Sequence, residues 1–463
     1  MRNGDVSFWS AAIHAGGTRP SLDGDTDVDF AIVGGGLTGL WTAYYLRREF
    51  PDARILVVES RFCGYGASGR NGGWLSAEVP GNRATYAGIA EARGQDGGAA
   101  NRALTVTMES AVREVASRIS DEQIDCDARY SGVLTVARCP AQHDRLLHDV
   151  AAATRWGSTG TVLLSQAELL RRVRVADALS ASYSPHCIRV QPARLTDGVA
   201  AAAERSGIRI VEGTTVTHVE PGRLTTDRGV VRADHIAICV EGFTPALPGR
   251  HRALLPMNSS MVVTEPLDHH QWDEIGWEGA ELLGESAHAY TYAQRTADGR
   301  IALGGRGVPY RYGSRTDDDG RTQPKTAGAL IRALQERFPS TRTASIDHTW
   351  CGVLGVHRDW CTSITFDERT GIASAAGYVG SGLTTTNVAA RTLVDLFAGR
   401  DTELTRLPWV GHRSPKWEPE PLRYLGVAGL YAAYRLADRL ELRSRAARTN
   451  VIATVADRVS GRS

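Results

Sequence analysis

The chain has 463 residues, more than one hydrophobic core usually supports, so we expect two domains. Its 53 lysine and arginine residues and 52 aspartate and glutamate residues leave a formal net charge of +1, which does not favour nucleic acid or an anionic membrane as a partner. The 7 cysteines never form a C-x-x-C pair, and neither a signal-peptide core nor an apolar run of ~20 residues occurs. These features predict a cytoplasmic enzyme that acts on a small molecule and has no metal site.

The first predicted elements are a strand, a tight turn and a helix. Residues 30–33 form a short apolar run, and apolar residues then recur at helical spacing. Between the two, Gly34, Gly36 and Gly39 form the pattern G-x-G-x-x-G. The first glycine permits the turn, the second lets the backbone approach a pyrophosphate, and the third lets the helix pack closely on the strand. Free N–H groups at the start of the helix would face the phosphates.

A second predicted strand, residues 55–58, ends at Glu59. This carboxylate lies about twenty residues after the last glycine, where an acidic side chain accepts hydrogen bonds from ribose hydroxyls. The alternative is a glycine turn that only packs a βαβ unit. The strand, helix and carboxylate in this order favour a bound dinucleotide instead.

The next segment, RFCGYGASGRNGG, separates FAD from NAD. It spans Arg61 to Gly73, and a second flexible, cationic loop suggests a ligand that continues beyond its adenosine and diphosphate. With this loop the chain resembles the FAD-dependent oxidoreductases of the D-amino-acid oxidase superfamily, and within it the γ-glutamylputrescine oxidase-like branch. The resemblance implies that the cofactor is FAD.

The resemblance continues in the middle of the chain. A predicted helix over 192–206 leads to residues 207–220, which are similar to the family's strand whose backbone, here at Val216, contacts the adenine end. Residues 233–243 resemble the hydrophobic strand that ends in glycine, here Gly242, beside the diphosphate.

Residues 377–399 resemble the closing flavin motif of the family, a glycine turn that runs into a helix. Reduction places negative charge near N1 and the C2 carbonyl of the flavin, and the helix N-terminus at 381–385 would stabilise it. The alternative is an ordinary Gly-Thr cap on a C-terminal helix. The residues expected to hold FAD are Gly34, Gly36, Leu37, Thr38, Gly39, Glu59, Ser60, Arg61, Gly66, Ala67, Ser68, Arg70, Asn71, Gly72, Gly73, Val216, Gly242, Gly380, Ser381, Gly382, Leu383, Thr384 and Thr385.

The implied fold class is α/β (α+β overall), with a discontinuous Rossmann-like FAD-binding domain and an antiparallel-sheet substrate domain. The expected ranges are 27–90, 185–250 and 345–410 for the first domain, 91–184 and 251–344 for the second, and 411–463 for a C-terminal helical extension. Arginines interrupt the apolar positions of the extension, so it could lie on a membrane surface. Its many small residues favour packing on another helix or subunit instead, so a homo-oligomer is possible and membrane contact is not expected.

The resemblance implies oxidation of a C–N bond. A polyamine-like or secondary amine would transfer hydride to flavin N5, giving an imine or aldehyde, and O2 would reoxidise the flavin to H2O2. The cofactor performs this chemistry, so no general base is expected. One alternative is a dehydrogenase that passes electrons to a carrier or quinone, and another is an FAD-binding partner subunit without turnover. A different flavin-dependent dehydrogenation also stays open, because fold does not determine function.

The chain departs from the family pattern at two places. Arg306 stands where sarcosine-oxidase-type members carry the cysteine that binds flavin covalently, so non-covalent FAD is expected. Where such members place basic residues for a substrate carboxylate, this chain has Gly73, Ser76 and Thr384, which favours a larger amine or polyamine derivative over a simple α-amino acid.

Residues 250–252 lie where the family carries a cation that assists O2 reduction, although a solvated basic turn explains them equally well.

The candidate catalytic and substrate-pocket residues are Trp74, Tyr290, Tyr292, His357 and Trp360. Tyr290 and Tyr292 alternate along a predicted strand, so both side chains should face the same side. Aromatic walls would dehydrate an amine and hold a cationic one by cation–π attraction. Core packing is the alternative for each aromatic residue, and a buried, hydrogen-bonded histidine is the alternative for His357.

Overall fold

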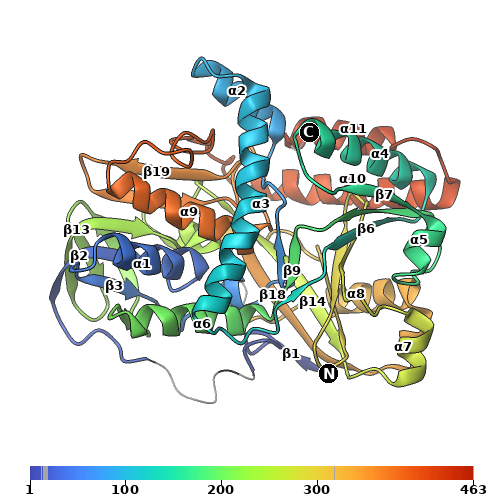
Figure 1. Cartoon of the computed structure of the whole chain (residues 1–463), viewed down its shortest axis with the longest axis horizontal. Helices are drawn as coiled ribbons and strands as arrows, with labels where there is room; N and C mark the ends of the chain where they lie inside the picture. Colours follow the sequence, from blue (N-terminus) through green and yellow to red (C-terminus); the bar gives the residue numbers. More distant parts are fainter. Residues whose placement is uncertain (12, 14–18, 317–318, 462–463) are drawn as a thin grey trace.

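The computed structural model describes the whole chain except residues 12, 14–18, 317–318 and 462–463. Two large sheets lie next to each other, each with its own helices (Figure 1). The first has 8 strands in the order β10-β3-β2-β13-β12-β11; β20 also pairs with β13, and β19 pairs with β20. Its strands are β2 (Thr26–Val33), β3 (Ile55–Val58), β10 (Arg209–Val211), β11 (Val216–Glu220), β12 (Arg223–Thr226), β13 (Val230–Ile238), β19 (Ser363–Asp367) and β20 (Ile372–Ala376).

The centre of this sheet is parallel. Strands β10, β3, β2, β13 and β20 all pair in parallel. The last four residues of β2 and all of β3 are buried, as expected for parallel strands covered on both faces. The helices that contribute to the hydrophobic cluster on one face include α1 (Leu37–Glu49), α3 (Gly97–Asp121), α6 (Pro192–Arg205) and α9 (Gly382–Phe397). The predicted strand–turn–helix–strand unit is therefore present.

The second sheet has 9 strands in the order β1-β18-β14-β17-β16-β15-β6-β8-β7. Its strands are β1 (Arg2–Asn3), β6 (Val133–Ala137), β7 (Val162–Ser165), β8 (Ser180–Ser184), β14 (Leu255–Thr264), β15 (Leu282–Glu285), β16 (Thr291–Arg295), β17 (Ile301–Gly305) and β18 (Ile346–Val356). The expected antiparallel ladder runs from β18 to β15 and from β6 to β7, while the β1–β18 and β15–β6 pairs are parallel.

Strand β18 pairs along most of its length with β14 in this second sheet. The range predicted for the FAD-binding domain, 345–410, therefore contributes β18 to the second sheet and β19 and β20 to the first. The division of the chain into domains stays a prediction.

A small sheet, β4-β9-β5, lies apart from both large sheets and consists of β4 (Trp74–Ser76), β9 (Cys187–Arg189) and β5 (Arg129–Tyr130). Short 3-10 helices include η2 (Ala67–Gly69) and η3 (Glu241–Ala246). The remaining helices are α2 (Arg83–Ala92), α4 (Pro140–Arg155), α5 (Gln166–Leu170), α7 (His269–Ile275), α8 (Pro324–Arg337), α10 (Leu422–Ser444) and α11 (Val451–Ser460).

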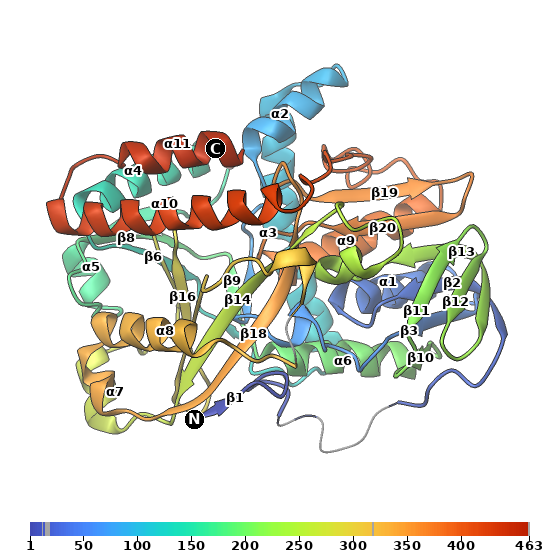
Figure 2. The same ribbon diagram turned by 180° about the vertical axis from the view of Figure 1, so that it is seen from behind.

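The C-terminal extension is helical, as predicted. Helices α10 and α11 lie beside α4, on the side of the molecule that holds the nine-stranded sheet, in both Figure 1 and Figure 2. Within the part of the chain that the structure describes, every helix is too short or too polar to cross a lipid bilayer.

Candidate active site

A cavity of about 1150 Å³ lies where the two large sheets meet. Its lining includes the carboxyl ends of β2, β3 and β13 from one sheet and residues of β14, β15, β16 and β18 from the other. Ligands of α/β folds bind outside the carboxyl ends of parallel strands. Small-molecule pockets usually measure ~300–1,000 Å³, so this cavity lies just above the upper end of that range.

The glycine motif forms one end of the cavity. Gly34 follows β2 with φ of +106°, a conformation that favours glycine. A Cβ atom on Gly39 would overlap the carbonyl oxygen of Gly34, so only glycine lets α1 pack this close to the end of β2. Gly36 is the N-cap of α1 and has no side chain to cap the helix. The backbone N–H of Leu37 donates to Ser68 Oγ at 2.9 Å.

Glu59 lies at the end of β3 and lines the cavity. Its Oε2 accepts a hydrogen bond from Gly35 N at 2.7 Å, and its Oε1 accepts one from Arg61 N at 2.9 Å. Burial raises the pKa of the Glu59 carboxyl, although these backbone donors favour the ionised form. The carboxyl is thus held rigidly at the edge where a ribose contact is predicted.

The loop over residues 61–73 wraps one side of the cavity. Arg70 is buried and donates from Nε to Tyr65 O at 2.6 Å and from Nη1 to Cys351 O at 3.1 Å, so it joins the loop to β18. Gly73 has φ of +71°, and a Cβ there would overlap the Val190 carbonyl. Arg61 points to the surface instead, where it pairs with Asp319 at 2.8 Å.

The closing motif brings the start of α9 to the cavity. Gly380 has φ of +109°, and Ser381 is the N-cap of α9 but makes no side-chain capping bond. Both residues, together with Gly382 and Leu383, line the cavity. The N–H groups and the positive dipole end of α9 are therefore available to a ligand.

Most of the predicted cofactor residues line this one cavity, and their donors suit an extended dinucleotide. Those lining it are Gly34, Gly36, Leu37, Thr38, Glu59, Ser60, Gly66, Ala67, Ser68, Arg70, Asn71, Gly72, Val216, Gly242, Gly380, Ser381, Gly382 and Leu383. Those outside the lining are Gly39, Arg61, Gly73, Thr384 and Thr385. Backbone amides from two helix starts, a buried carboxyl and close-packed glycines fit FAD, and each residue's contact with it stays a prediction.

Four of the five candidate substrate-pocket residues also line the cavity, namely Trp74, Tyr290, Tyr292 and Trp360. The ring centroids of Tyr290 and Tyr292 are 6.5 Å apart, and those of Trp74 and Tyr292 are 6.1 Å apart. The Tyr292 hydroxyl lies 2.8 Å from Ser259 Oγ. Gly304 leaves space for the Tyr292 ring, which a Cβ at that position would overlap. Tyr290 directly precedes β16 and Tyr292 lies within it, and both line the cavity.

His357 lies outside the cavity lining. The residue is 9% exposed, and its Nδ1 is 2.7 Å from the Cys361 carbonyl oxygen. Burial lowers the pKa of His357, so the neutral ring is favoured. The structure supports the buried, hydrogen-bonded alternative, because the chain leaves the cavity wall after Leu354 and returns to it only at Trp360.

The basic turn at 250–252 does not line the cavity either. His251 Nδ1 is 2.8 Å from Pro245 O, and Arg252 Nε donates to Trp417 O at 2.5 Å. These side chains are engaged with backbone carbonyls, so the structure does not support them as the cation that assists O2 reduction.

Three further cavity residues were not predicted as site residues. Arg306, noted only as the replacement for a cysteine, lines the cavity, and its buried Nη1 has no hydrogen-bond partner among the described residues. Glu241, at φ +41°, accepts hydrogen bonds from Gly355 N and, at 3.4 Å, Tyr378 N. Burial raises the pKa of Glu241 to about 7.

The third is Tyr431, which comes from α10. Glu241 could have been identified from the sequence, because it is an acidic residue just after an apolar strand. No local pattern distinguishes Tyr431 from a core residue.

Comparisons with known proteins agree with this geometry. The sequence profile of a family described as "FAD dependent oxidoreductase" (DAO) matches residues 29–396. The chain is 28% identical over 450 residues to a gamma-glutamylputrescine oxidoreductase of Escherichia coli (strain K12), covering 94% of this chain and 98% of that protein. It is also 28% identical over 416 residues to a probable oxidoreductase OrdL of Rhizobium meliloti (strain 1021), covering 87% and 90%.

Solved structures share the fold. Glycine oxidase from Geobacillus kaustophilus superposes with a TM-score of 0.65 at 20% identity, over 84% of this chain and 99% of that one. L-Proline dehydrogenase from P. horikoshii superposes with a TM-score of 0.67 at 17% identity, over 84% and 98%.

Proposed function

Since the chain belongs to the family of FAD-dependent oxidoreductases, we propose that it oxidises the C–N bond of an amine, with FAD held non-covalently. Bound FAD supplies the two-electron oxidation by accepting a hydride from the carbon next to the amine nitrogen. The amine also loses a proton, the resulting imine is hydrolysed by water to a carbonyl compound, and O2 is reduced to H2O2. The curated relative named gamma-glutamylputrescine oxidoreductase supports an amine as the substrate.

The observation that carries this proposal is the aromatic wall opposite the dinucleotide motifs. Trp74, Tyr290 and Tyr292 line the same cavity as the glycine turns. Their rings exclude water from a bound amine and hold its carbon in a restricted volume. The Trp74 Nε1 is buried and has no hydrogen-bond partner among the described residues, so it can donate to a ligand.

Three positions favour a larger amine or polyamine derivative over a simple α-amino acid. Gly73 and Thr384 lie outside the cavity lining, and Ser76 within it carries no charge, so none of these positions binds a carboxylate as a basic residue would. The cavity also extends along α4, where Leu146 and Trp156 contribute to its lining. A long substrate can occupy this extension while its reacting carbon stays near Tyr292.

The test is a screen of the FAD-loaded protein with γ-glutamylated and free polyamines, N-methyl amines and amino acids. Anaerobic addition of the right amine should bleach the visible flavin band, and air should restore it with release of H2O2. Bleaching with slow recovery in air would favour a dehydrogenase that uses a carrier or quinone. A flavin that no amine bleaches would favour a partner subunit without turnover. A Gly39→Val variant, expected to lack FAD, is the control for peroxide from other sources.

A further inference from the structure

The C-terminal helices lie beyond the family profile, which ends at residue 396, whereas α10 begins at Leu422. The buried residues Val427, Tyr431, Tyr434 and Glu441 recur at helical spacing, so one face of α10 packs on the rest of the protein. Figure 2 shows α10 running across the part of the molecule that contains β6, β8 and β16. Tyr431 of this helix contacts Met257 of β14 and lines the cavity, so α10 packs on the nine-stranded sheet beside the cavity.

The extension reaches the cavity itself. Tyr431 of α10, Thr449 of the turn after α10 and Asp457 of α11 all line it. Tyr431 is 6% exposed, and its hydroxyl is 3.2 Å from Met257 Sδ of β14. Its ring therefore separates the inner cavity from the outer surface of α10.

A second residue of α10 holds the segment that carries Arg306. Arg435 Nη2 donates to the carbonyl oxygens of Arg306, at 3.3 Å, and of Gly307. These carbonyls directly follow β17, whose ladder ends at Gly305. Arg435 thus replaces the missing ladder partner and determines where the Arg306 side chain enters the cavity.

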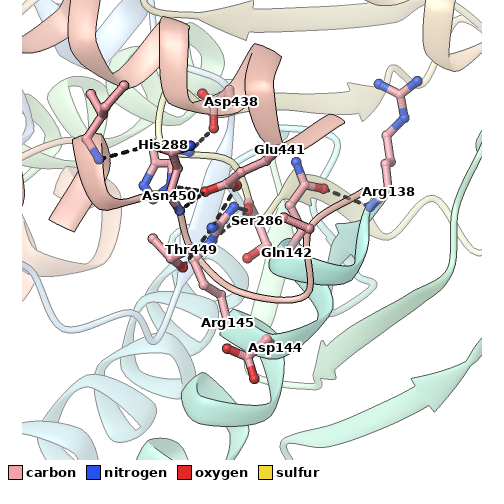
Figure 3. A network of polar contacts seen from close by, with 12 residues as sticks. Arg138, Gln142, Asp144, Arg145, Ser286, His288, Asp438, Glu441, Thr449 and Asn450 are labelled. Carbon is pink, nitrogen blue, oxygen red and sulfur yellow. Dashed lines mark hydrogen bonds and ion pairs between the residues drawn. The ribbon is translucent and has the colours of Figure 1, made fainter. Parts of the chain in front are cut away.

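A buried polar network anchors α10 in this position (Figure 3). Glu441 accepts hydrogen bonds from Arg145 Nη1 at 2.9 Å, from His288 Nε2 at 3.2 Å and from Asn450 N at 2.8 Å. Asp438 accepts from His288 N at 2.9 Å. Arg145 belongs to α4 and His288 to the loop after β15, so the network joins three distant segments.

The same network borders the cavity. Arg145 and His288 line it, and Arg145 also donates to the carbonyl oxygen of Ser286, another lining residue, at 2.7 Å. Movement of α10 would therefore change the shape of the cavity as well as the surface of the protein.

We propose that α10 is part of the active site: Tyr431 contacts the substrate, and Arg435 acts as a positioning residue that orients Arg306 toward it. The C-terminal extension thereby helps to determine which amines are accepted. This inference rests on the proposed amine oxidation.

The experiment compares two pairs of variants of the FAD-loaded full chain with the best amine from the screen. In the first pair, Arg435→Met should raise KM at least tenfold and alter the visible circular dichroism of the flavin. Arg439→Met is its matched control, because Arg439 lies one turn away on the exposed face of α10. Arg435→Lys should restore most of the loss, since an ammonium can donate to the same two carbonyls.

In the second pair, Tyr431→Leu should raise KM and change the order of preference among amines of different length. Its control is Tyr424→Leu, because Tyr424 is 37% exposed and outside the cavity lining. Flavin content and melting temperature show whether each variant is folded. If Arg435→Met and Tyr431→Leu behave like their controls while the unmodified protein oxidises the amine, the inference is wrong and the proposed function stands. If the unmodified protein oxidises no amine, the proposed function is wrong, and the inference that rests on it is wrong as well.

Discussion

The two halves of the cavity are built in different ways. The carboxyl edge of the eight-stranded sheet presents backbone: glycine turns at Gly34 and Gly380, and the N–H groups at the starts of α1 and α9. The opposite wall presents side chains such as Tyr292 and Tyr431, which come from a strand and from a helix far apart in sequence. Backbone sites require contiguous residues with special conformations, whereas side-chain walls require elements to pack together.

The largest expected effect is on the backbone half. Gly39→Val places a side chain against the Gly34 carbonyl, so α1 cannot approach β2 and the purified protein should contain no flavin. Gly88→Ala in α2 is the control, because a Cβ there meets nothing within 4 Å and alanine favours a helix by roughly 1 kcal/mol. The ratio of visible to ultraviolet absorbance measures the flavin content. A Gly39→Val protein that still binds flavin would show that the close approach is not required.

The side-chain half should respond in activity and not in flavin content. Gly304→Ala places a methyl group against the Tyr292 ring and displaces it, and kcat/KM should fall by about 100-fold, the size expected for a misplacement of roughly 1 Å. Gly328→Ala, where a Cβ meets only the end of Arg332 at 3.5 Å, is the matched control. Loss of flavin from Gly304→Ala would instead mean that this wall supports the cofactor.

Glu241 lies between the two halves and should make stability depend on pH. Its pKa is raised to about 7, so between its ordinary pKa and about 7 the folded state keeps a proton that the unfolded state has lost. Its contribution to the free energy of unfolding is therefore fully present at low pH and is lost as the pH rises through about 7. The total loss is about 3 kcal/mol at most. Glu241→Gln should flatten the melting temperature of the holoprotein across this range. Parallel curves for both proteins would contradict the prediction.

The smallest effect is expected at His357. Replacement by glutamine removes the bond to the Cys361 carbonyl and should lower stability by about 1–2 kcal/mol. The pH dependence of kcat/KM should stay unchanged, because the ring lies outside the cavity lining. Denaturant unfolding measures the stability, and a pH–rate profile measures the pH dependence of kcat/KM. A changed profile would indicate that His357 takes part in catalysis.

The sequence by itself determined the backbone half of the site. Gly34, Gly36 and Gly39 could be assigned from their spacing, because each is required by a local turn or a close approach within one βαβ unit. Tyr290 and Tyr292 were also predictable, since alternation along a strand places both on one side.

Only the tertiary structure decided the rest. His357 and Trp360 lie three residues apart, yet Trp360 alone lines the cavity, because the path of the chain after β18 determines which side chain faces inward. Arg306 and Tyr431 both line the cavity only because α10 packs on the nine-stranded sheet and is anchored there by Glu441. Such long-range packing leaves no local pattern in the sequence, since the same apolar spacing describes any helix with one buried face.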